Sequence, residues 1–249
     1  MKVIVSLHLK PLPGSPNFLS FEDCLDHAVR NAILIENCGA DAIIVENFND
    51  KPFFIKAPPE TIASMSVIVR EIVREISIPV GVNVLRNDGV AALAIAKATG
   101  AKFIRVNQMI FPAVMPEGFV EPIAAKIARY KRFLNCNAKI FADLSVKHSV
   151  QLAKIEDFID NVDRAYCDAV IVTGKKTGEP PEAGILKRIK ELVDMPVILG
   201  SGATPENLRN YDADGVIVGT YVKEGENYSC KKLKQVLSEA KKLGGELDL

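Results

Sequence analysis

The chain has 249 residues, and its 31 basic residues (Lys and Arg) balance its 31 acidic residues (Asp and Glu). This balance speaks against a nucleic-acid-binding surface and against attraction to an acidic membrane. Hydrophobic residues make up 48% of the chain, enough for a sizeable core, and no run approaches the ~20 apolar residues of a membrane helix. We therefore expect a soluble, cytoplasmic protein with no nucleic-acid partner and no membrane insertion.

Short runs rich in valine and isoleucine alternate with longer helical patterns along the chain. The predicted strands are Val3–His8, Asp41–Glu46, Val80–Val84, Lys102–Asn107, Lys139–Asp143, Ala169–Thr173, Val197–Gly200 and Gly215–Gly219. The predicted helices span residues 20–37, 59–76, 88–99, 119–134, 152–165, 182–193, 204–210 and 229–243. Strict alternation indicates parallel strands joined by crossover helices. Eight such units in ~250 residues fit one closed (β/α)₈ TIM barrel, so we expect residues 1–249 to form a single domain of that α/β class.

An open doubly wound sheet is the alternative fold. Such a fold is expected to have fewer strands, or a GxGxxG motif after the first strand. The sequence predicts eight strands and lacks the motif. The closed barrel is therefore the preferred prediction.

Polar residues gather at the carboxyl ends of the predicted strands, on the side that alternation turns into the barrel. They are Ser6, His8, Glu46, Asn83, Arg105, Asn107, Asp143 and Thr173. Ion pairs of Arg105 with Glu46 or Asp143 would explain part of this cluster, but buried charges at a barrel mouth usually serve a ligand. We predict a substrate-binding set of His8, Lys10, Asn83, Arg105, Asn107, Thr173, Gly174 and Lys175.

The seventh and eighth units carry glycine-rich turns. The seventh reads VILGSGATPEN, where Gly200 and Gly202 allow close backbone approach and Ser201 offers a hydroxyl. Thr204 is a natural N-cap, which predicts a helix from that point. The eighth strand ends at Gly219 and Thr220, and phosphate binding after strands seven and eight recurs in this fold. We predict that Gly200, Ser201, Gly202, Gly219 and Thr220 bind phosphate, the alternative being that the glycines only make tight turns.

The fifth unit reads FADLSVKHS, in which Asp143, Ser145 and Lys147 share one side if the strand extends. A carboxylate near an ammonium can exchange a proton with a substrate when the site shifts their pKa values. We predict Asp143 as general base, Lys147 or His148 as acid, and Glu46 as an orienting or second acid–base group. A Schiff-base mechanism ranks lower, because no lysine lies inside a strand with inward parity.

No motif points to an organic cofactor. Glu46, Asp143, His8 and His148 could converge on a divalent metal, but no HxH or HExxH spacing supports such a site. We therefore predict no metal ligand and leave a metal requirement open.

The cysteines are five in number and form no CxxC pair. An odd count without a pairing motif favours buried, reduced thiols for Cys24, Cys38, Cys136, Cys167 and Cys230. Of the histidines, we expect His27 on a helix surface.

Apolar residues in the second and fourth loops need a separate explanation. They are Phe53, Phe54, Met109, Ile110, Phe111, Val114 and Met115. They could form a lid, an oligomer interface or loop packing on the barrel rim. We favour an interface, and so expect a homo-oligomer.

Several motifs in order resemble the BtpA family across nearly the whole chain. The matching segments are SLHLKPLPGSP from Ser6, DAIIVENFNDKPF from Asp41, GVNVLRND from Gly81, ADLSVKHS from Ala142, VTGKKTG from Val172, and GSGATPEN with DGVIVGTYVK near the end. The resemblance implies a phosphate-binding (β/α)₈ barrel. The family is named after a thylakoid-associated cyanobacterial factor needed for photosystem I accumulation, and it implies no particular reaction. Tyr221-Val222 departs from the smaller or more polar residues expected at that turn.

Three functions compete at this point. The first is an enzyme acting on a phosphorylated sugar or nucleotide-like metabolite by proton transfer, as isomerase, lyase or hydrolase. The second is a non-catalytic assembly or stability factor of the photosystem I biogenesis kind, working through its apolar loops. The third is a ligand sensor that binds phosphate without turnover.

Overall fold

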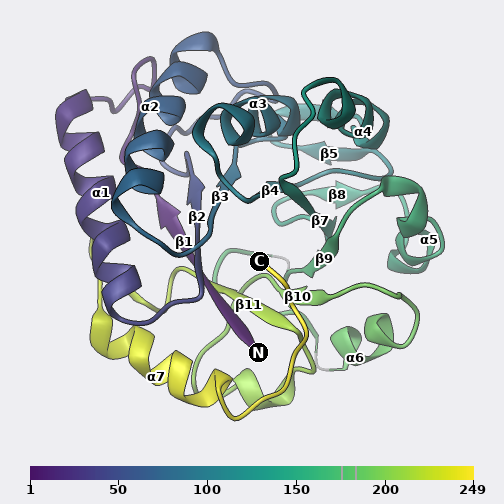
Figure 1. Cartoon of the computed structure of the whole chain (residues 1–249). Coiled ribbons are helices and arrows are strands. Elements are labelled where there is room, and N and C mark those ends of the chain that lie inside the picture. The colour runs from purple at the N-terminus through teal and green to yellow at the C-terminus, as the bar shows by residue number, and fades with distance from the viewer. Residues whose placement is uncertain (175, 183) are drawn as a thin grey trace.

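Eight parallel strands close into a barrel in the computed structural model, which describes residues 1–174, 176–182 and 184–249 (Figure 1). The barrel strands are β1 (Lys2–His8), β2 (Ala42–Glu46), β3 (Val80–Asn83), β4 (Phe103–Val106), β7 (Lys139–Ser145), β9 (Ala169–Val172), β10 (Val197–Leu199) and β11 (Gly215–Val218). The pairing of β11 with β1, from Lys2 beside Gly215 to Val5 beside Val218, closes the ring. The predicted fold class is confirmed, and each predicted strand matches an observed one to within two residues at either end.

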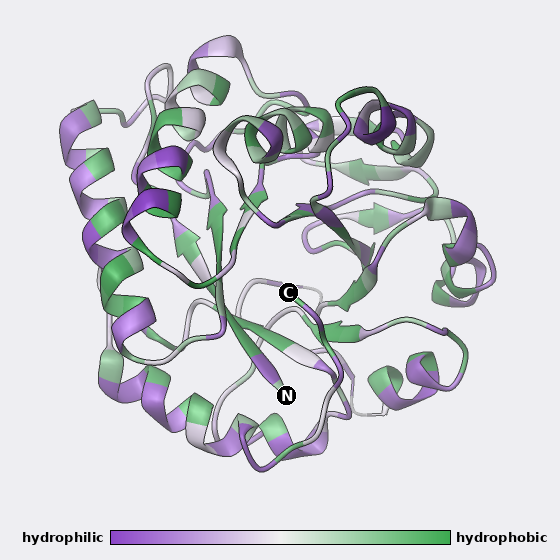
Figure 2. Ribbon diagram, viewed as in Figure 1, coloured by the Kyte–Doolittle hydropathy of each residue, from purple (hydrophilic) through white to green (hydrophobic). Residues whose placement is uncertain are grey.

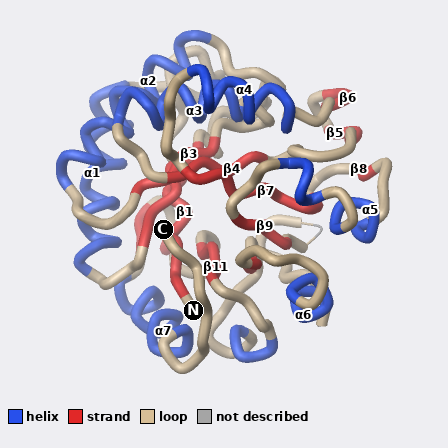
Figure 3. The backbone as a smooth tube through the Cα atoms, turned by 45° about the vertical axis from the view of Figure 1, so that its right-hand side comes forward, coloured by secondary structure: helices blue, strands red, loops and turns tan. Residues whose placement is uncertain are grey.

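Helices surround the barrel (Figure 3). They are α1 (Phe21–Asn37), α2 (Pro59–Glu75), α3 (Gly89–Thr99), α4 (Ala124–Phe133), α5 (Ile155–Ile159), α6 (Ile185–Lys190) and α7 (Cys230–Ala240). The helix predicted at 152–165 is divided into α5 and the 3₁₀ helix η1 (Val162–Ala165). The helix predicted at 204–210 was wrong, because the chain there makes a turn and a short 3₁₀ helix, η2 (Leu208–Asn210). None of the described helices has the length and apolar character needed to cross a bilayer.

Local signals in the sequence explain where the long helices begin and end. The Ser20 hydroxyl accepts a hydrogen bond from the Asp23 amide at 3.3 Å and so caps α1. The Asp88 carboxylate caps α3 in the same way, accepting from the Ala91 amide at 3.0 Å. Gly100 ends α3 in the left-handed conformation that favours glycine. These caps satisfy backbone groups that a helix end leaves unpaired.

Two apolar layers hold the barrel together. The inner layer fills the ring with Ile4, Ile44, Ile171, Ile198 and the stacked rings of Phe103 and Phe141. The outer layer lies between the strands and the apolar faces of the helices, whose outward faces are hydrophilic (Figure 2). Because successive side chains of a strand point to opposite sides, strands with both faces buried are nearly continuous in valine and isoleucine.

The C-terminal tail covers the end of the barrel where the strands begin. Leu247 is buried in the inner layer, and the Met1 ammonium donates a hydrogen bond to the Leu243 carbonyl at 2.6 Å. Figure 1 shows the tail crossing this end beside the N-terminus. A ligand therefore reaches the interior from the other end, where the strands finish.

Two small sheets lie outside the barrel and were not predicted. One has three strands, β5 (Ala113–Met115), β6 (Gly118–Val120) and β8 (Val150–Gln151). The other is a hairpin of β12 (Lys223–Glu224) and β13 (Asn227–Tyr228). Each strand is too short for a periodicity signal in the sequence.

The apolar loop residues mostly pack onto the barrel, which corrects their expected exposure. Met109 and Met115 are buried, and Ile110 and Phe111 are half-buried against the outer layer. Phe53 is also half-buried. Phe54 and Val114 remain exposed, at 67% and 44%. Met109, Met115, Ile110 and Phe111 thus fit the rim-packing alternative, and the homo-oligomer stays a prediction.

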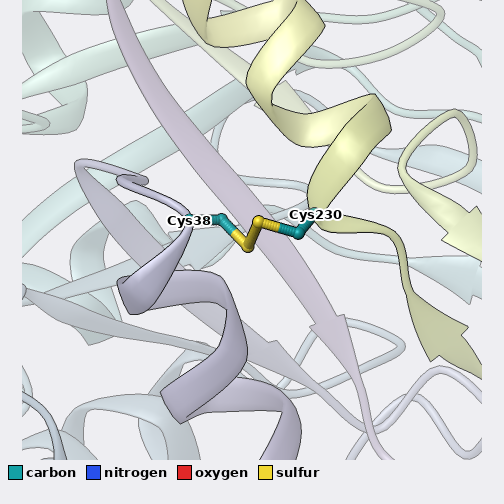
Figure 4. The surroundings of a disulfide bond; sticks show 2 residues. All are labelled: Cys38 and Cys230. Carbon is teal, nitrogen blue, oxygen red and sulfur yellow. A yellow bond between two sulfur atoms is a disulfide. The ribbon is translucent and has the colours of Figure 1, made fainter.

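A disulfide joins Cys38, after α1, to Cys230, at the start of α7 (Figure 4). The prediction of reduced thiols was wrong for this pair and holds for the free thiols Cys24, Cys136 and Cys167, of which the last is half-buried. The pairing was invisible in the sequence because 192 positions separate the two residues. The prediction for His27 was also wrong: its ring is buried, with Nε2 3.1 Å from the Glu226 carbonyl.

Candidate functional site

A cavity of about 240 Å³ opens at the carboxyl ends of the barrel strands. Its lining residues come from two parts of the ring. One wall carries ionisable side chains from the ends of β1, β2, β4 and β7, namely His8, Glu46, Arg105 and Lys147. The other wall is the backbone of the turns after β10 and β11, with Gly200, Ser201, Gly202, Ala203, Gly219, Thr220 and Tyr221. We call these the charged wall and the amide wall.

Arg105 organises the charged wall. Its Nε and Nη2 atoms donate to both carboxylate oxygens of Asp143 at 3.1–3.2 Å, and its Nη1 donates to Glu46 Oε1 at 3.3 Å. All three side chains are almost fully enclosed. A guanidinium is planar and stays charged, so it can hold two carboxylates in fixed positions.

Two asparagines support this arrangement from neighbouring strands. Asn83 Nδ2 donates to Glu46 Oε1 at 3.2 Å, and Asn107 Nδ2 donates to Asp143 Oδ2 at 2.8 Å. The Oδ1 atoms of both asparagines are buried and find no hydrogen-bond partner in the described chain. Buried polar atoms are rarely left unpaired, but neither asparagine lines the cavity, so both act here as supports of the two carboxylates.

The two carboxylates differ in exposure and in the direction of their pKa shifts. Glu46 lines the cavity, whereas Asp143 lies beneath Arg105 and does not. Burial raises the pKa of Glu46, but Arg105, His8 and Asn83 together outweigh burial and leave the pKa below its ordinary value. Burial raises the pKa of Asp143 above its ordinary value, against the opposing effects of Arg105 and Asn107. Glu46 is therefore the ionised carboxylate that a ligand would meet.

Three neighbouring residues hold the His8 side chain and backbone in place. Its ring stacks on Phe48 with centroids 4.1 Å apart, and its amide donates to the Tyr228 hydroxyl at 3.0 Å. The Lys223 ammonium has only donors, so at 3.3 Å it donates to His8 Nδ1. This contact places the ring proton on Nε2, 3.7 Å from Glu46 Oε2.

The imidazole of His8 is neutral near pH 7. Burial lowers its pKa to about 4, and the nearby Lys223 and Lys147 add to the decrease while Glu46 opposes it. A neutral imidazole with Nε2–H facing a cavity is a hydrogen-bond donor that does not lose its proton readily.

Lys147 lies two residues beyond β7 and reaches the cavity. Burial and the positive charge of Arg105 lower its pKa to about 8. In the described part of the chain, no acceptor lies within hydrogen-bond distance of its ammonium. The Arg86 guanidinium donates to the Lys147 carbonyl and lies 3.5 Å from Glu117 Oε2, which fixes the backbone at this point.

Unpaired backbone donors characterise the amide wall. Among the described residues, no acceptor bonds the amides of Ser201, Gly202, Ala203, Gly219, Thr220 and Tyr221. Side chains at Gly200 and Gly202 would prevent this turn, since a Cβ would lie 2.4 Å from Ile171 at the first and 2.1 Å from the Pro180 nitrogen at the second. Successive free amides around a concave turn form a binding place for an anion.

The Ser201 hydroxyl is not free for a ligand. It accepts from the Gly174 amide at 2.9 Å and donates to the Glu179 carbonyl at 2.8 Å. Thr173 is buried behind the turn, with its methyl group against Gly200. Ser201, Thr173 and Gly174 thus support the amide wall from behind. Because no α-helix forms at 204–210, the positive partial charge of this wall comes from the amides of the turns and not from a helix N-terminus.

Two further predicted residues, His148 and Lys10, lie outside the cavity. His148 is exposed, with Nε2 3.1 Å from the Thr177 hydroxyl, and does not line the cavity. His148 lies beyond the end of β7 and has a positive φ of 56°, so the chain turns there and does not continue the strand. Lys10 is paired with Asp23 at 2.8 Å and Glu226 at 3.5 Å, outside the cavity. Lys175 lies outside the described residues.

Several residues of the site escaped the sequence analysis. Phe48, Lys223 and Tyr228 surround His8. Tyr228 and His8 are 220 positions apart, so no local pattern could join them. Among the described residues, no three His, Cys, Asp or Glu side chains converge as a metal site would require.

The barrel resembles solved enzyme structures in its fold. N-(5'-phosphoribosyl)anthranilate isomerase from Pyrococcus furiosus superposes with a TM-score of 0.63, over 98% of this chain and 100% of that chain. The two sequences are 15% identical, so this likeness establishes the fold alone.

Sequence relatives identify the family. An uncharacterized protein of Archaeoglobus fulgidus is 48% identical over 241 residues, covering 96% of this chain and 98% of the relative. The photosystem I biogenesis protein BtpA of Synechocystis sp. is 36% identical over 233 residues, covering 90% and 81%. The model of the BtpA family matches residues 1–242. This chain therefore belongs to the BtpA family.

Proposed function

We propose that this protein is an enzyme that binds a small phosphorylated metabolite, of sugar or nucleotide-like type, and transfers a proton on it as an isomerase, lyase or hydrolase. One observation carries the proposal: a single cavity is lined both by unpaired amides and by the side chains of Glu46, His8 and Lys147. The groups that would bind an anion and the groups that would move a proton thus face the same ligand.

The amide wall suits a phosphate group. A phosphate has several acceptor oxygens, and the free amides after β10 and β11 are donors without competing partners in the described chain. Arg105 and Lys147 add positive charge to the same cavity. Phosphate binding after the seventh and eighth strands is a recurrent use of this fold.

The charged wall suits proton transfer. Ionised Glu46 faces the cavity and is the base in this proposal, while neutral His8 donates from Nε2 to a carbonyl oxygen that gains negative charge. Lys147 is the acid. Asp143, expected from the sequence as the base, is instead a positioning residue, because it is enclosed and bonded to Arg105.

Thermal melting with defined ligands tests the binding half of the proposal. Inorganic phosphate and ribose 5-phosphate should raise the melting temperature, and ribose should not, because only the phosphate engages the amides. Thr220→Glu places a carboxylate at the exposed end of the amide wall and should abolish the shift. Thr220→Gln, which has the same shape without charge, should retain it.

Equal stabilisation of both variants would contradict the assignment of the amide wall. Proton transfer is tested separately, by following solvent deuterium exchange into ribose 5-phosphate by NMR. Glu46→Gln should slow exchange by about 100-fold or more if Glu46 is the base, while the ribose 5-phosphate melting shift persists. Exchange at the original rate would remove Glu46 from this role.

A second candidate function, docking to a protein partner, has its own observation. Phe119, Val114 and Val150 lie side by side across β6, β5 and β8, and all are exposed, at 57%, 44% and 65%. Such a row of exposed apolar side chains often marks a docking surface. The Synechocystis relative is named for photosystem I biogenesis, a task that assembly of protein partners would serve.

Rescue of a Synechocystis strain lacking BtpA would separate the two candidates. If docking is the function, Phe119→Glu should lose the restored level of photosystem I and Thr220→Glu should keep it. If binding of a phosphorylated metabolite is the function, Thr220→Glu should lose the restored level of photosystem I and Phe119→Glu should keep it.

A further inference from the structure

Lys147 differs from the other cations near the cavity. Arg105 is paired with Asp143 and Glu46, and Lys223 contacts His8 Nδ1. In the described chain, Lys147 has no acceptor within hydrogen-bond distance, although it is enclosed by the cavity wall. A lysine used only to neutralise charge would gain from a carboxylate partner, so this arrangement leaves its nitrogen available for another bond.

We propose that Lys147 Nζ forms an imine with the carbonyl carbon of a phosphorylated aldehyde or ketone held in this cavity. This inference rests on the proposed function, names its substrate class, and gives Lys147 the role of nucleophile in place of acid. The phosphate would occupy the amide wall, and the carbonyl would lie against the charged wall beside Lys147 and Glu46. A cavity of about 240 Å³ is small for a ligand site, which favours a compact sugar phosphate.

The protonation state of Lys147 supports nucleophilic attack. An ordinary lysine, with a pKa of 10.5, is neutral in about 1 molecule in 3,000 at pH 7, whereas a pKa of about 8 leaves about 1 in 10 neutral. Burial and the neighbouring Arg105 and Arg86 cause this decrease. Desolvation beside another cation is an established way to activate a lysine toward carbonyl groups.

The bond changes balance without an oxidant or a reductant. The lone pair of the neutral amine forms the new C–N bond, and the C=O π electrons move to oxygen. Both N–H protons then leave with that oxygen as water, and the imine nitrogen takes up one proton from solvent. Glu46 lies in the same cavity and is placed to carry these protons. The protonated imine then withdraws electrons from the adjacent carbon, which eases the proton transfer assigned to Glu46.

The sequence analysis ranked this chemistry low because no lysine occupies an inward position within a strand. The structure brings Lys147 to the cavity from the segment after β7, beyond a register shift between Asp143 and Ser145 in the pairing of β7 with β9. Arg86 then holds the Lys147 carbonyl. A bulge at a barrel rim commonly re-aims a side chain in this way.

Reductive trapping tests the proposal on the full chain. The protein is incubated with ribose 5-phosphate or dihydroxyacetone phosphate in sodium cyanoborohydride, which reduces imines, and labelled lysines are located by peptide mass spectrometry. We expect labelling concentrated on Lys147, at least about tenfold above the mean of the other lysines. Ribose and dihydroxyacetone, without phosphate, should give no such concentration.

Matched variants define the outcomes. Lys147→Arg should abolish the site-specific label, and Lys187→Arg, an exposed lysine of α6, should keep it. Thr220→Glu should lose the label if the phosphate directs the carbonyl. Uniform labelling of all lysines, unchanged in Lys147→Arg, overturns the imine. If ribose 5-phosphate still raises the melting temperature in that case, the proposed phosphate binding stands alone; if it does not, both proposals fail.

Discussion

The two walls of the cavity satisfy their polar groups in opposite ways. In the charged wall, Arg105, Glu46 and Asp143 are enclosed and bonded to one another and to Asn83 and Asn107. In the amide wall, the backbone donors of the turns after β10 and β11 have no acceptor in the described chain. The ion-pair network of Arg105 is bonded within the protein, whereas the amides of the second wall are open.

This difference separates stability from binding. Breaking a buried ion-pair network leaves a charge without a partner and destabilises the fold. Changing an open turn alters what it can bind and leaves the core intact. Removing Arg105 should therefore act mainly on unfolding, and blocking the free amides should act mainly on anion affinity.

Removing Arg105 should have the largest effect. Arg105→Met leaves two buried carboxylates facing each other and should lower the free energy of unfolding by about 3–5 kcal/mol, measured by urea denaturation. Arg188→Met is the matched control, because Arg188 pairs with Glu156 at 3.1 Å on the surface. That pair should contribute less than about 1 kcal/mol. Equal losses in both variants would contradict the view that the charged wall stabilises the barrel.

The disulfide is connected to the amide wall through the chain, because Cys230 anchors the segment that follows the turn after β11. Cys230 begins α7, shortly after Tyr228, which holds the end of β1. Cys230→Ser should lower the free energy of unfolding by about 2–4 kcal/mol in oxidising buffer. Thiol titration of the denatured protein should find three free thiols without reductant and five with it. Five thiols in both conditions would mean that the bond does not form.

The barrel and the polar face of its interior could be read from the sequence. Both follow from local pattern: strands buried on two faces are continuous in branched apolar residues, and alternation assigns His8, Glu46 and Arg105 to one side. Predicting the fold required only that these local signals agree with one another along the chain.

The roles within the site could not be read in the same way. Whether Glu46 or Asp143 faces a ligand depends on the level at which each strand ends and on where Arg105 lies between them. The register shift after Asp143 and the contact of Tyr228 with His8 are tertiary features. A local sequence pattern does not show which residues become neighbours in the folded protein. The sequence analysis therefore assigned the role of base to Asp143, whereas the geometry favours Glu46.

The pH dependence of stability tests the environment of His8. Because its pKa is about 4 in the folded protein and near 6.5 when unfolded, the unfolded chain binds more protons between these values. This contribution is fully present above pH 6.5 and is lost as pH falls toward 4, by at most about 3 kcal/mol. His8→Gln should flatten this part of the curve in urea denaturation from pH 4 to 7. The pKa of His148 is also lowered, by desolvation and nearby cations, but its side chain is exposed, so His148→Gln should change the slope less than His8→Gln does.

Ser201→Ala should have the smallest effect of the substitutions considered, and this effect should be on stability. If its hydroxyl bound phosphate, as the sequence suggested, Ser201→Ala would weaken phosphate affinity and leave stability unchanged. The hydroxyl instead bridges the Gly174 amide and the Glu179 carbonyl. Its loss should therefore lower the free energy of unfolding by about 1–2 kcal/mol, and phosphate affinity should change by less than about threefold, since the Ser201 amide remains. Calorimetric titration with inorganic phosphate, beside urea denaturation, measures both, and a large loss of affinity with no loss of stability would return the hydroxyl to the ligand.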